Sequence, residues 1–250
     1  LYYETNSFSI TKQDSSDVSK DEFSVDKSGT AKFLDKVFVN VSKQKVGYHS
    51  QLHVVAVNGD SSTDVEVIEE INGYYFYMPA CNVNIWVSFV PNEDTVYYVE
   101  HYFADLSDGE FTLFYTEKKK AETNSIVSAS QLQRNGFVFD ETNENNVVEA
   151  AVLADGSLVL KVYYQRSIYQ IQFKDYDGTT DVFEPFSLRY GEPLPTVPND
   201  SYVDGDNIFY WVENGSAYSA DGIVERDMII TKSKFTQTIS SKEEFYQAFG

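Results

Sequence analysis

Short runs of alternating hydrophobic and polar residues, separated by turn-forming residues, dominate this chain of 250 residues. Alternation with a period of two places every second side chain on one face of an extended strand, so it predicts β-strands with one buried face. The clearest runs span 36–42, 51–57, 82–89, 157–164 and 167–173. Gly, Asn and Asp recur between the runs, as at 58–60 and 108–109, and predict tight turns. The pattern predicts an all-β fold.

Helical periodicity is scarce. The segment 125–133 is compatible with a short helix. The better candidate is 241–249, where Ser241 is suited to cap the first turn and the Glu pair that follows favours a helix start. We therefore expect only a minor α content.

The composition supports packed cores and disfavours some partners. Hydrophobic residues make up 42% of the chain, including 19 Tyr and 18 Phe, so compositional disorder is not expected. The formal net charge of −20 repels phosphate backbones and anionic lipids, so we expect no nucleic-acid partner. Cys81 is the only cysteine and cannot form an intramolecular disulfide. No apolar run approaches the roughly 20 residues that span a bilayer, so no membrane insertion is expected.

Strong strand ends at Phe89, Tyr164 and Phe235, each followed by a short polar join, divide the chain into three small domains. We predict domains at 5–92, 93–166 and 167–236, each a sandwich or β-grasp-like fold, in an elongated tandem array. Because the opening "LYYETNSFSI" is similar to 162–171, residues 1–4 are expected to end a preceding repeat. Residues 237–250 are expected to start a following one.

Residues 74–89, "YYFYMPACNVNIWVSF", resemble the closing hairpin of bacterial surface repeats with the pattern Tyr-x-Phe-x-Met-Pro followed by alternating apolar residues. Residues 98–164, with "YVEHYFADLSDGEFTLFYTE" and "DGSLVLKVYY", resemble the mucin-binding-protein-type (MucBP-like) modules of Gram-positive surface proteins. Residues 168–235, with "RYGEPLP" and "DMIITKSKF", resemble an internalin B-type repeat with a β-grasp-like fold, although Tyr210 and Phe235 depart from its usual residues.

The resemblance implies a secreted or wall-attached protein at the surface of a Gram-positive bacterium. It implies a non-catalytic stalk or adhesive module that binds, or presents binding to, a host or neighbouring protein. The alternative is a carbohydrate-binding accessory region of a secreted polysaccharide-degrading protein. No enzymatic activity, cofactor or metal is expected from these modules.

Catalytic and metal-binding patterns are scarce in the sequence. Glu69 and Glu70 lie beside a turn and favour a solvated hairpin end over an acid pair. His49 and His53 share a strand face but lie about 13 Å apart in an extended strand, too far to ligate one metal. The stretch "DYDGTTD" at 175–181 begins like a calcium loop but lacks the later Glu, and Asp and Gly are also ordinary turn residues. The basic run "EKKKAE" at 117–122 favours a solvated loop or a sheet edge.

The remaining candidate site is aromatic. If 74–78 and 83–89 form one hairpin, alternation buries Tyr74, Phe76 and Met78 together with Val83, Ile85, Val87 and Phe89. Tyr75, Tyr77 and Trp86 then share the opposite face. Exposed contiguous rings tend to mark contacts, so these three residues are the predicted binding surface for a protein or a glycan. The alternatives are packing of this face on an adjacent domain or loop, and exposed rings without a partner.

Overall fold

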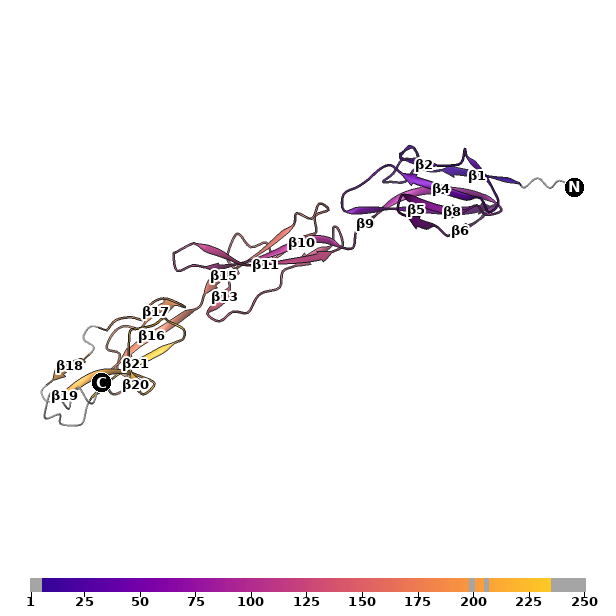
Figure 1. The fold of residues 1–250 in the computed structure, drawn as a ribbon. Coiled ribbons are helices and arrows are strands. Elements are labelled where there is room, and N and C mark those ends of the chain that lie inside the picture. The colour runs from indigo at the N-terminus through magenta and orange to yellow at the C-terminus, as the bar shows by residue number, and fades with distance from the viewer. Residues whose placement is uncertain (1–5, 198–200, 205–206, 235–250) are drawn as a thin grey trace. The chain divides into compact units, whose positions relative to one another are not determined.

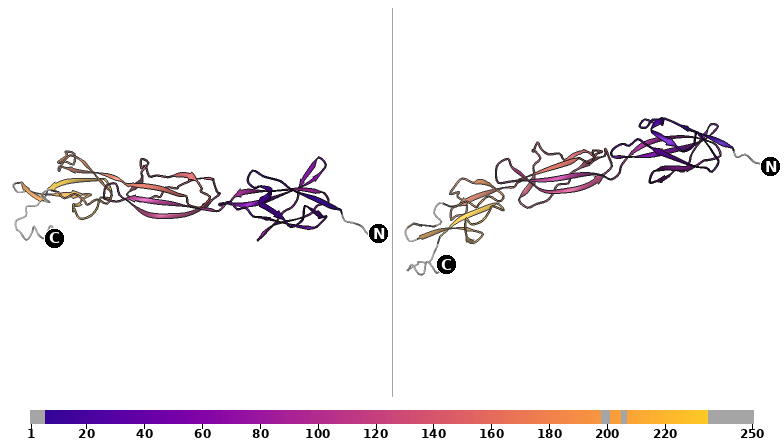
Figure 2. Two further views of the ribbon diagram at one scale, coloured as in Figure 1. Left: turned by 90° about the horizontal axis from the view of Figure 1, so that it is seen from above. Right: turned by 45° about the horizontal axis from the view of Figure 1, so that its top comes forward.

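The computed structural model describes residues 6–197, 201–204 and 207–234, and all of its regular elements there except one short 3₁₀ helix are β-strands. The chain forms two compact units, and Figure 1 labels most of their strands. Of the described residues, the first contains 6–99, 117–129 and 147–160, and the second contains 100–116, 130–146, 161–197, 201–204 and 207–234. The two further views in Figure 2 show strands and loops in each unit. The predicted all-β fold is confirmed.

Most of the first unit is a two-layer sandwich, which we call the first sandwich. One sheet has the order β3-β1-β9-β5-β6 and the other the order β2-β4-β8-β7. The strands of the first sheet are Thr30–Lys32, Ser7–Lys12, Asn82–Pro91, Tyr48–Asn58 and Ser61–Asp64, in that order. Those of the second are Phe23–Val25, Lys36–Val41, Gly73–Tyr77 and Ile68–Glu70.

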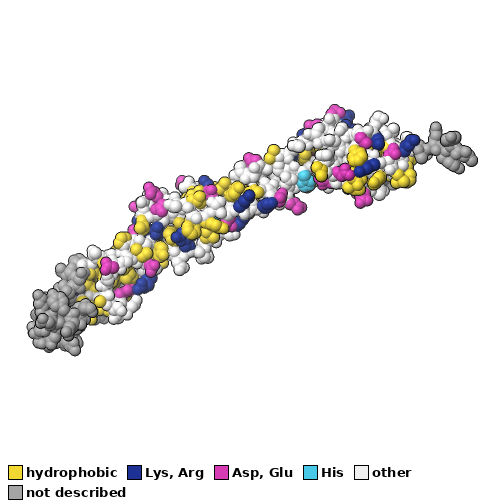
Figure 3. Space-filling view, in the orientation of Figure 1, with side chains coloured by type: hydrophobic (Ala, Val, Ile, Leu, Met, Phe, Trp, Pro, Cys, Tyr) yellow, Lys and Arg dark blue, Asp and Glu magenta, His cyan; other side chains and the backbone are white. Residues whose placement is uncertain are grey.

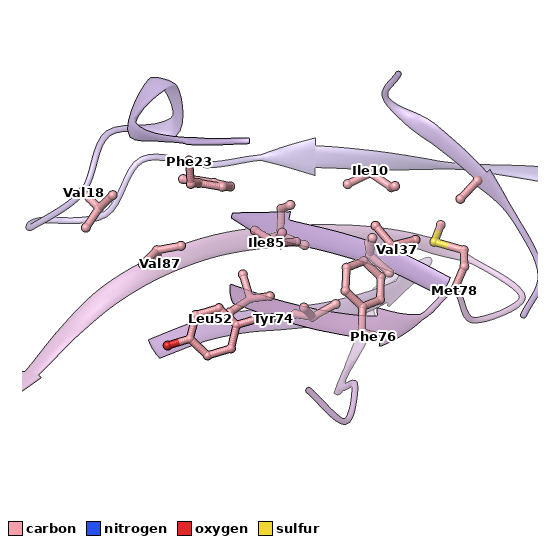
Figure 4. Packing of buried hydrophobic residues seen from close by; sticks show 14 of the residues in the cluster. Ile10, Val18, Phe23, Val37, Leu52, Tyr74, Phe76, Met78, Ile85 and Val87 are labelled. Carbon is pink, nitrogen blue, oxygen red and sulfur yellow. The ribbon is translucent and has the colours of Figure 1, made fainter. Parts of the chain in front are cut away.

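The inward residues of both sheets form one core. Every inward position predicted from alternation at 74–89 is buried, from Phe76, Met78, Val83, Ile85 and Val87 at 0% exposure to Phe89 at 9%. Figure 4 shows Phe76, Met78, Ile85 and Val87 among the side chains that point between the two layers of strands. A 3₁₀ helix, η1 (Lys20–Glu22), begins with a capping box in which Ser19 and Glu22 bond each other's backbone, and it leads into β2.

A second group of strands comprises β10 (Thr95–Ala104), β11 (Phe111–Ala121), β13 (Phe137–Phe139) and β15 (Val159–Arg166). Their order in the sheet is β11-β10-β15-β13, so β11 is an edge strand. The basic run at 118–120 therefore lies on a sheet edge, one of its two predicted locations. A small ribbon pairs β12 (Ile126–Ser128) with β14 (Glu149–Ala151). The helix considered for 125–133 is wrong, because Val127 pairs with Ala150 in this ribbon.

The C-terminal sheet lies in the second unit and has the order β17-β16-β21-β19-β18, with β20 paired to β19. Its strands in chain order are Ile168–Lys174, Phe186–Arg189, Ser201–Asp204, Asn207–Glu213, Ser216–Ala217 and Met228–Lys234. Ile171, Phe173, Trp211 and Ile230 belong to its buried core. The helix predicted at 241–249, the expected ends at 1–4 and 237–250, and Phe235 lie outside the described residues.

Candidate functional site

The three predicted site residues do not share one face. Tyr75 and Tyr77 lie on β8, which pairs with β4 and β7, whereas Trp86 lies on β9 in the other sheet. Since the inward faces of the two sheets meet in the core, their outward faces lie on opposite sides of the first sandwich. The hairpin that would join these strands in one sheet is wrong. Met78 is instead held by backbone bonds to Leu34 and Asp35, and the chain crosses there from one layer to the other.

Tyr75 and Tyr77 belong to an aromatic cluster with Phe38 of β4, which we call the Lys36 cluster. Lys36 Nζ lies 3.6 Å from the ring centroid of Tyr75 and 4.4 Å from that of Phe38. The same ammonium group bonds Glu70 Oε1 at 3.1 Å. Tyr77 meets Tyr75 edge to face and is 51% exposed. Because Lys36 covers ring faces of Tyr75 and Phe38, Tyr77 is the most accessible of these three rings.

Trp86 also has a partner within its own sheet. It pairs across strands with His53, and the two rings stack at 5.1 Å between centroids with an interplanar angle of 7°. His53 Nε2 is in turn 2.8 Å from Ser88 Oγ. One face of the indole is therefore covered by His53, which reduces the area that a ligand could contact.

A hollow of about 370 Å³ adjoins the Lys36 cluster. Its two carboxylates, Asp26 and Glu70, are already engaged: Asp26 Oδ1 accepts from the Phe38 amide at 2.9 Å, and Glu70 bonds Lys36. Both carboxylates of the hollow thus have partners within the chain.

The histidines and aspartates singled out in the sequence have structural partners. His49 Nδ1 is 3.1 Å from Asn92 Oδ1, and buried His101 is 3.0 Å from the hydroxyl of Tyr164. In the stretch 175–181, Asp177 accepts from the amides of Thr179 and Thr180 at 2.8 and 2.9 Å. These backbone bonds hold the pKa of Asp177 well below its usual range. Within the described ranges, no group of three His, Cys, Asp or Glu side chains is arranged to hold a metal ion.

A second aromatic cluster, in the second unit, was not predicted. Arg134 lies over three phenyl rings, with its guanidinium carbon 4.7, 4.2 and 5.0 Å from the centroids of Phe103, Phe114 and Phe137. Arg166 lies 5.1 Å from the centroid of Phe137. These residues line a hollow of about 270 Å³, which we call the Arg134 hollow. In Figure 3, hydrophobic and cationic side chains lie together in the region of the β11-β10-β15-β13 sheet.

The Arg134 hollow could not be found from alternation. Its rings come from β10, β11 and β13, which are separated in sequence, and Arg134 itself lies in the loop before β13. The only local signal is the run "FTLFY" at 111–115, where apolar residues occupy both faces of one strand. Such a run departs from the alternation of the other strands.

The comparisons with known proteins add no family: the chain matches no protein-family model and no curated protein. No helix among the described residues has the length and hydropathy of a membrane span.

Proposed function

We propose that this chain is a non-catalytic, load-bearing part of a secreted or cell-surface repeat protein of a Gram-positive bacterium. It serves as a stalk or adhesive module that binds, or presents binding to, a host or neighbouring protein. The resemblance of 74–89, 98–164 and 168–235 to surface repeats supports this proposal. One observation carries it. In the first sandwich, and again in the C-terminal sheet, the first strand pairs in parallel with the last strand.

In the first sandwich, the first strand β1 pairs in parallel with the last strand β9, and Ile10, Thr11 and Lys12 lie opposite Val83, Asn84 and Ile85. The chain enters such a pair at one end and leaves it at the other. Tension applied through the chain therefore slides the two strands past each other. All the hydrogen bonds between them resist at once, whereas a hairpin pulled from its open end loses them one at a time.

The C-terminal sheet repeats this arrangement. Its first strand β16 pairs in parallel with its last strand β21, with Ile171 opposite Met228 and Lys174 opposite Thr231. In the β11-β10-β15-β13 sheet, β10 and β15 are the first and last strands in chain order and are neighbours. The ring pairs Tyr102–Tyr163 and Phe103–Tyr164 advance in the same direction along these two strands, as parallel strands require.

The joins between these strands are short. Residues 92–94 connect β9 to β10, and Ser167 alone connects β15 to β16. Tension leaving one parallel pair therefore enters the next through one to three residues. This continuity of strands suits a chain that transmits force.

Single-molecule force spectroscopy on the whole chain tests the load-bearing role. Gln13→Pro removes the bond from the Gln13 amide to the Ile85 carbonyl, which ties the end of β1 to β9. Val65→Pro is the matched control, because it removes the bond from the Val65 amide to the Val54 carbonyl, away from the parallel pair. Both variants should lose about 1 to 3 kcal/mol of equilibrium stability. We expect Gln13→Pro to lower the unfolding force of the first sandwich markedly more than Val65→Pro does; equal forces would refute the proposal.

The location and the partner need separate tests. An antibody raised against the whole chain should label unpermeabilised cells of the source bacterium, and labelling only after permeabilisation would refute surface display.

The second candidate, a carbohydrate-binding accessory region, is favoured by the half-exposed ring of Tyr77 on the Lys36 cluster. Affinity electrophoresis on a panel of polysaccharides tests it: retardation should be lost in Tyr77→Ala and weakened in Tyr75→Ala, whereas Trp86→Ala, in the other sheet, should leave it unchanged.

A further inference from the structure

Half of edge strand β11 is exposed on both of its faces. The side chains of the five residues from Thr112 to Thr116 are all exposed, including Leu113 at 44%, Phe114 at 56% and Tyr115 at 51%. β10 occupies one side of β11, and no described strand pairs with its other side. Natural sheets protect such edges with lysines or proline, and here the lysines come only after residue 117. An unprotected apolar edge is suited to receive another strand.

The Arg134 hollow adjoins this edge, because Thr112, Leu113 and Phe114 form part of its lining. The chain has four arginines. Arg189 pairs with Asp108 and Glu192, and Arg226 pairs with Glu213. In the described part of the chain, Arg134 and Arg166 form no ion pair, although acidic residues outnumber basic ones by 39 to 19.

The donors of these two arginines are incompletely used. Arg166 Nη1 donates to the Tyr190 carbonyl at 2.8 Å, whereas the buried Arg166 Nε has no hydrogen-bond partner. The guanidinium of Arg134 faces rings, which accept no strong hydrogen bond from its N–H groups. Asp105 also lines the hollow, but its Oδ2 accepts from Thr112 Oγ1 at 2.8 Å and it forms no ion pair with either arginine. Neither Arg134 nor Arg166 is therefore ion-paired with a carboxylate of the lining.

We propose that the outer edge of β11 at residues 111–116 binds an extended segment of a partner protein as an added strand, and that an acidic side chain of this segment pairs with Arg134. This inference does not depend on the load-bearing role. Charge complementarity selects an acidic segment, because a planar guanidinium backed by phenyl rings is suited to bind a carboxylate through two parallel bonds.

The position of Phe114 connects the two features. It lies on the strand that offers the open edge, and its ring is the one closest to Arg134. In an added strand, the residue directly opposite Phe114 has its Cβ about 5 Å away and points to the same face. A Glu or Asp at that position is thus within reach of the guanidinium. Leu113 and Tyr115 point to the other face, so apolar residues are expected on both sides of the acid.

A second copy of this chain is a weaker occupant, because each copy carries a net charge of −20 and repels the other. An acidic sugar could supply a carboxylate, but it has no backbone with which to pair along five exposed strand residues. Both alternatives give different results in the test below.

The test uses the whole chain and a library of octapeptides with β-branched residues around one central Glu. Binding is followed by NMR through the side-chain Nε–H signals of the four arginines. We expect acidic peptides to shift the Arg134 and Arg166 signals and to leave those of Arg189 and Arg226 in place. Replacing the central Glu by Gln, or using the variant Arg134→Gln, should weaken binding about tenfold or more. Arg226→Gln, with the same charge change at an ion-paired arginine, should leave binding unchanged.

Backbone pairing is tested with peptides N-methylated at alternate residues, which lose the donors on one edge. Their binding should be abolished for one methylation pattern and retained for the other. The proposal is overturned if no acidic member of the library shifts the Arg134 signal, if both methylation patterns bind equally, or if Arg134→Gln binds as the unmodified chain does. It is also overturned if a glucuronate disaccharide binds more tightly than every peptide, or if sedimentation shows a dimer that excludes the peptides. Retained signal dispersion in each variant checks that it is folded.

Discussion

The Lys36 cluster and the Arg134 hollow both place a cation over aromatic rings, but they differ in how the charge is balanced. Lys36 lies over Phe38 and Tyr75 and bonds Glu70. Arg134 lies over Phe103, Phe114 and Phe137 and forms no ion pair with a described residue. In the Lys36 cluster, the charge of Lys36 is balanced by Glu70. In the Arg134 hollow, the charge of Arg134 is left for a partner to neutralise.

This difference teaches that exposed rings alone do not identify a binding surface. The sequence predicts Tyr75, Tyr77 and Trp86 as a binding surface because rings at outward positions tend to mark contacts. In the structure Tyr75 contacts Lys36, and Trp86 stacks on His53. An unbalanced charge beside the rings of the second cluster is the additional feature that favours a ligand.

The prediction with the largest expected effect asks whether the Lys36 cluster and the Arg134 hollow unfold independently of each other. Phe76→Ala empties a fully buried position of the first sandwich and should cost about 3 to 5 kcal/mol. In a urea titration, the signals of the first sandwich should disappear at lower denaturant than in the unmodified chain. The Arg134 Nε–H signal should persist to an unchanged midpoint. Loss of both together would show that the two clusters belong to one cooperative unit, and the comparison between them would fail.

A prediction with a smaller expected effect concerns how the charges of Lys36 and Arg134 are balanced. Lys36→Gln and Glu70→Gln should each destabilise the first sandwich, and the double variant should cost less than the sum by about 0.3 to 1 kcal/mol, because the pair is half exposed. The matched cycle uses Arg134→Gln and Asp105→Asn, which line one hollow without an ion pair. We expect that second pair to be additive in thermal unfolding. Coupling as large as that of Lys36 and Glu70 would mean that Asp105 balances Arg134.

The strands and their inward faces could be predicted from the sequence because both follow from local alternation. The runs at 36–42, 51–57, 82–89, 157–164 and 167–173 correspond to β4, β5, β9, β15 and β16. The buried positions of Phe76, Met78 and Ile85 follow from the same period. Alternation fixes which side of a strand is buried, and this held for both strands of the predicted hairpin.

Alternation does not determine which strands are neighbours. β9 pairs with β1 and β5 rather than β8, and these pairings depend on contacts between segments far apart in sequence. For this reason alternation alone places Trp86 on the same face as Tyr75 and Tyr77, which is wrong. The Arg134 hollow depends in the same way on three strands and a loop. The predicted division at 92 and 166 stays a prediction, as do the array and its ends.

The smallest expected effect concerns two tyrosines that are protected for different reasons. Tyr102 donates its hydroxyl proton to Glu100 Oε2 at 2.6 Å, and this bond, more than burial, raises its pKa from 10.0 to about 12. The pKa of Tyr218 is also raised to about 12, and for this residue burial is the main cause. A raised pKa in the folded state means that the stabilising contribution is complete below pH 10 and is lost as the pH rises toward about 12. Ionised Tyr102 would have no proton to donate and would repel the Glu100 carboxylate.

The ionisation of Tyr102 and Tyr218 can be followed through the near-ultraviolet absorbance of tyrosinate. In the folded chain, Tyr102→Phe and Tyr218→Phe should each remove one titration step near pH 12, and Glu100→Gln should move the step of Tyr102 back toward pH 10 while leaving that of Tyr218. If Glu100→Gln leaves the Tyr102 step in place, the hydrogen bond is not the cause. The protection of this ring would then come from burial, and it would resemble the buried Tyr74 of the first sandwich, whose pKa is raised mainly by burial. A hydroxyl held by a partly buried carboxylate is, like the Lys36 cluster, a contact completed within the chain. The Arg134 hollow differs from both because its charge has no such partner.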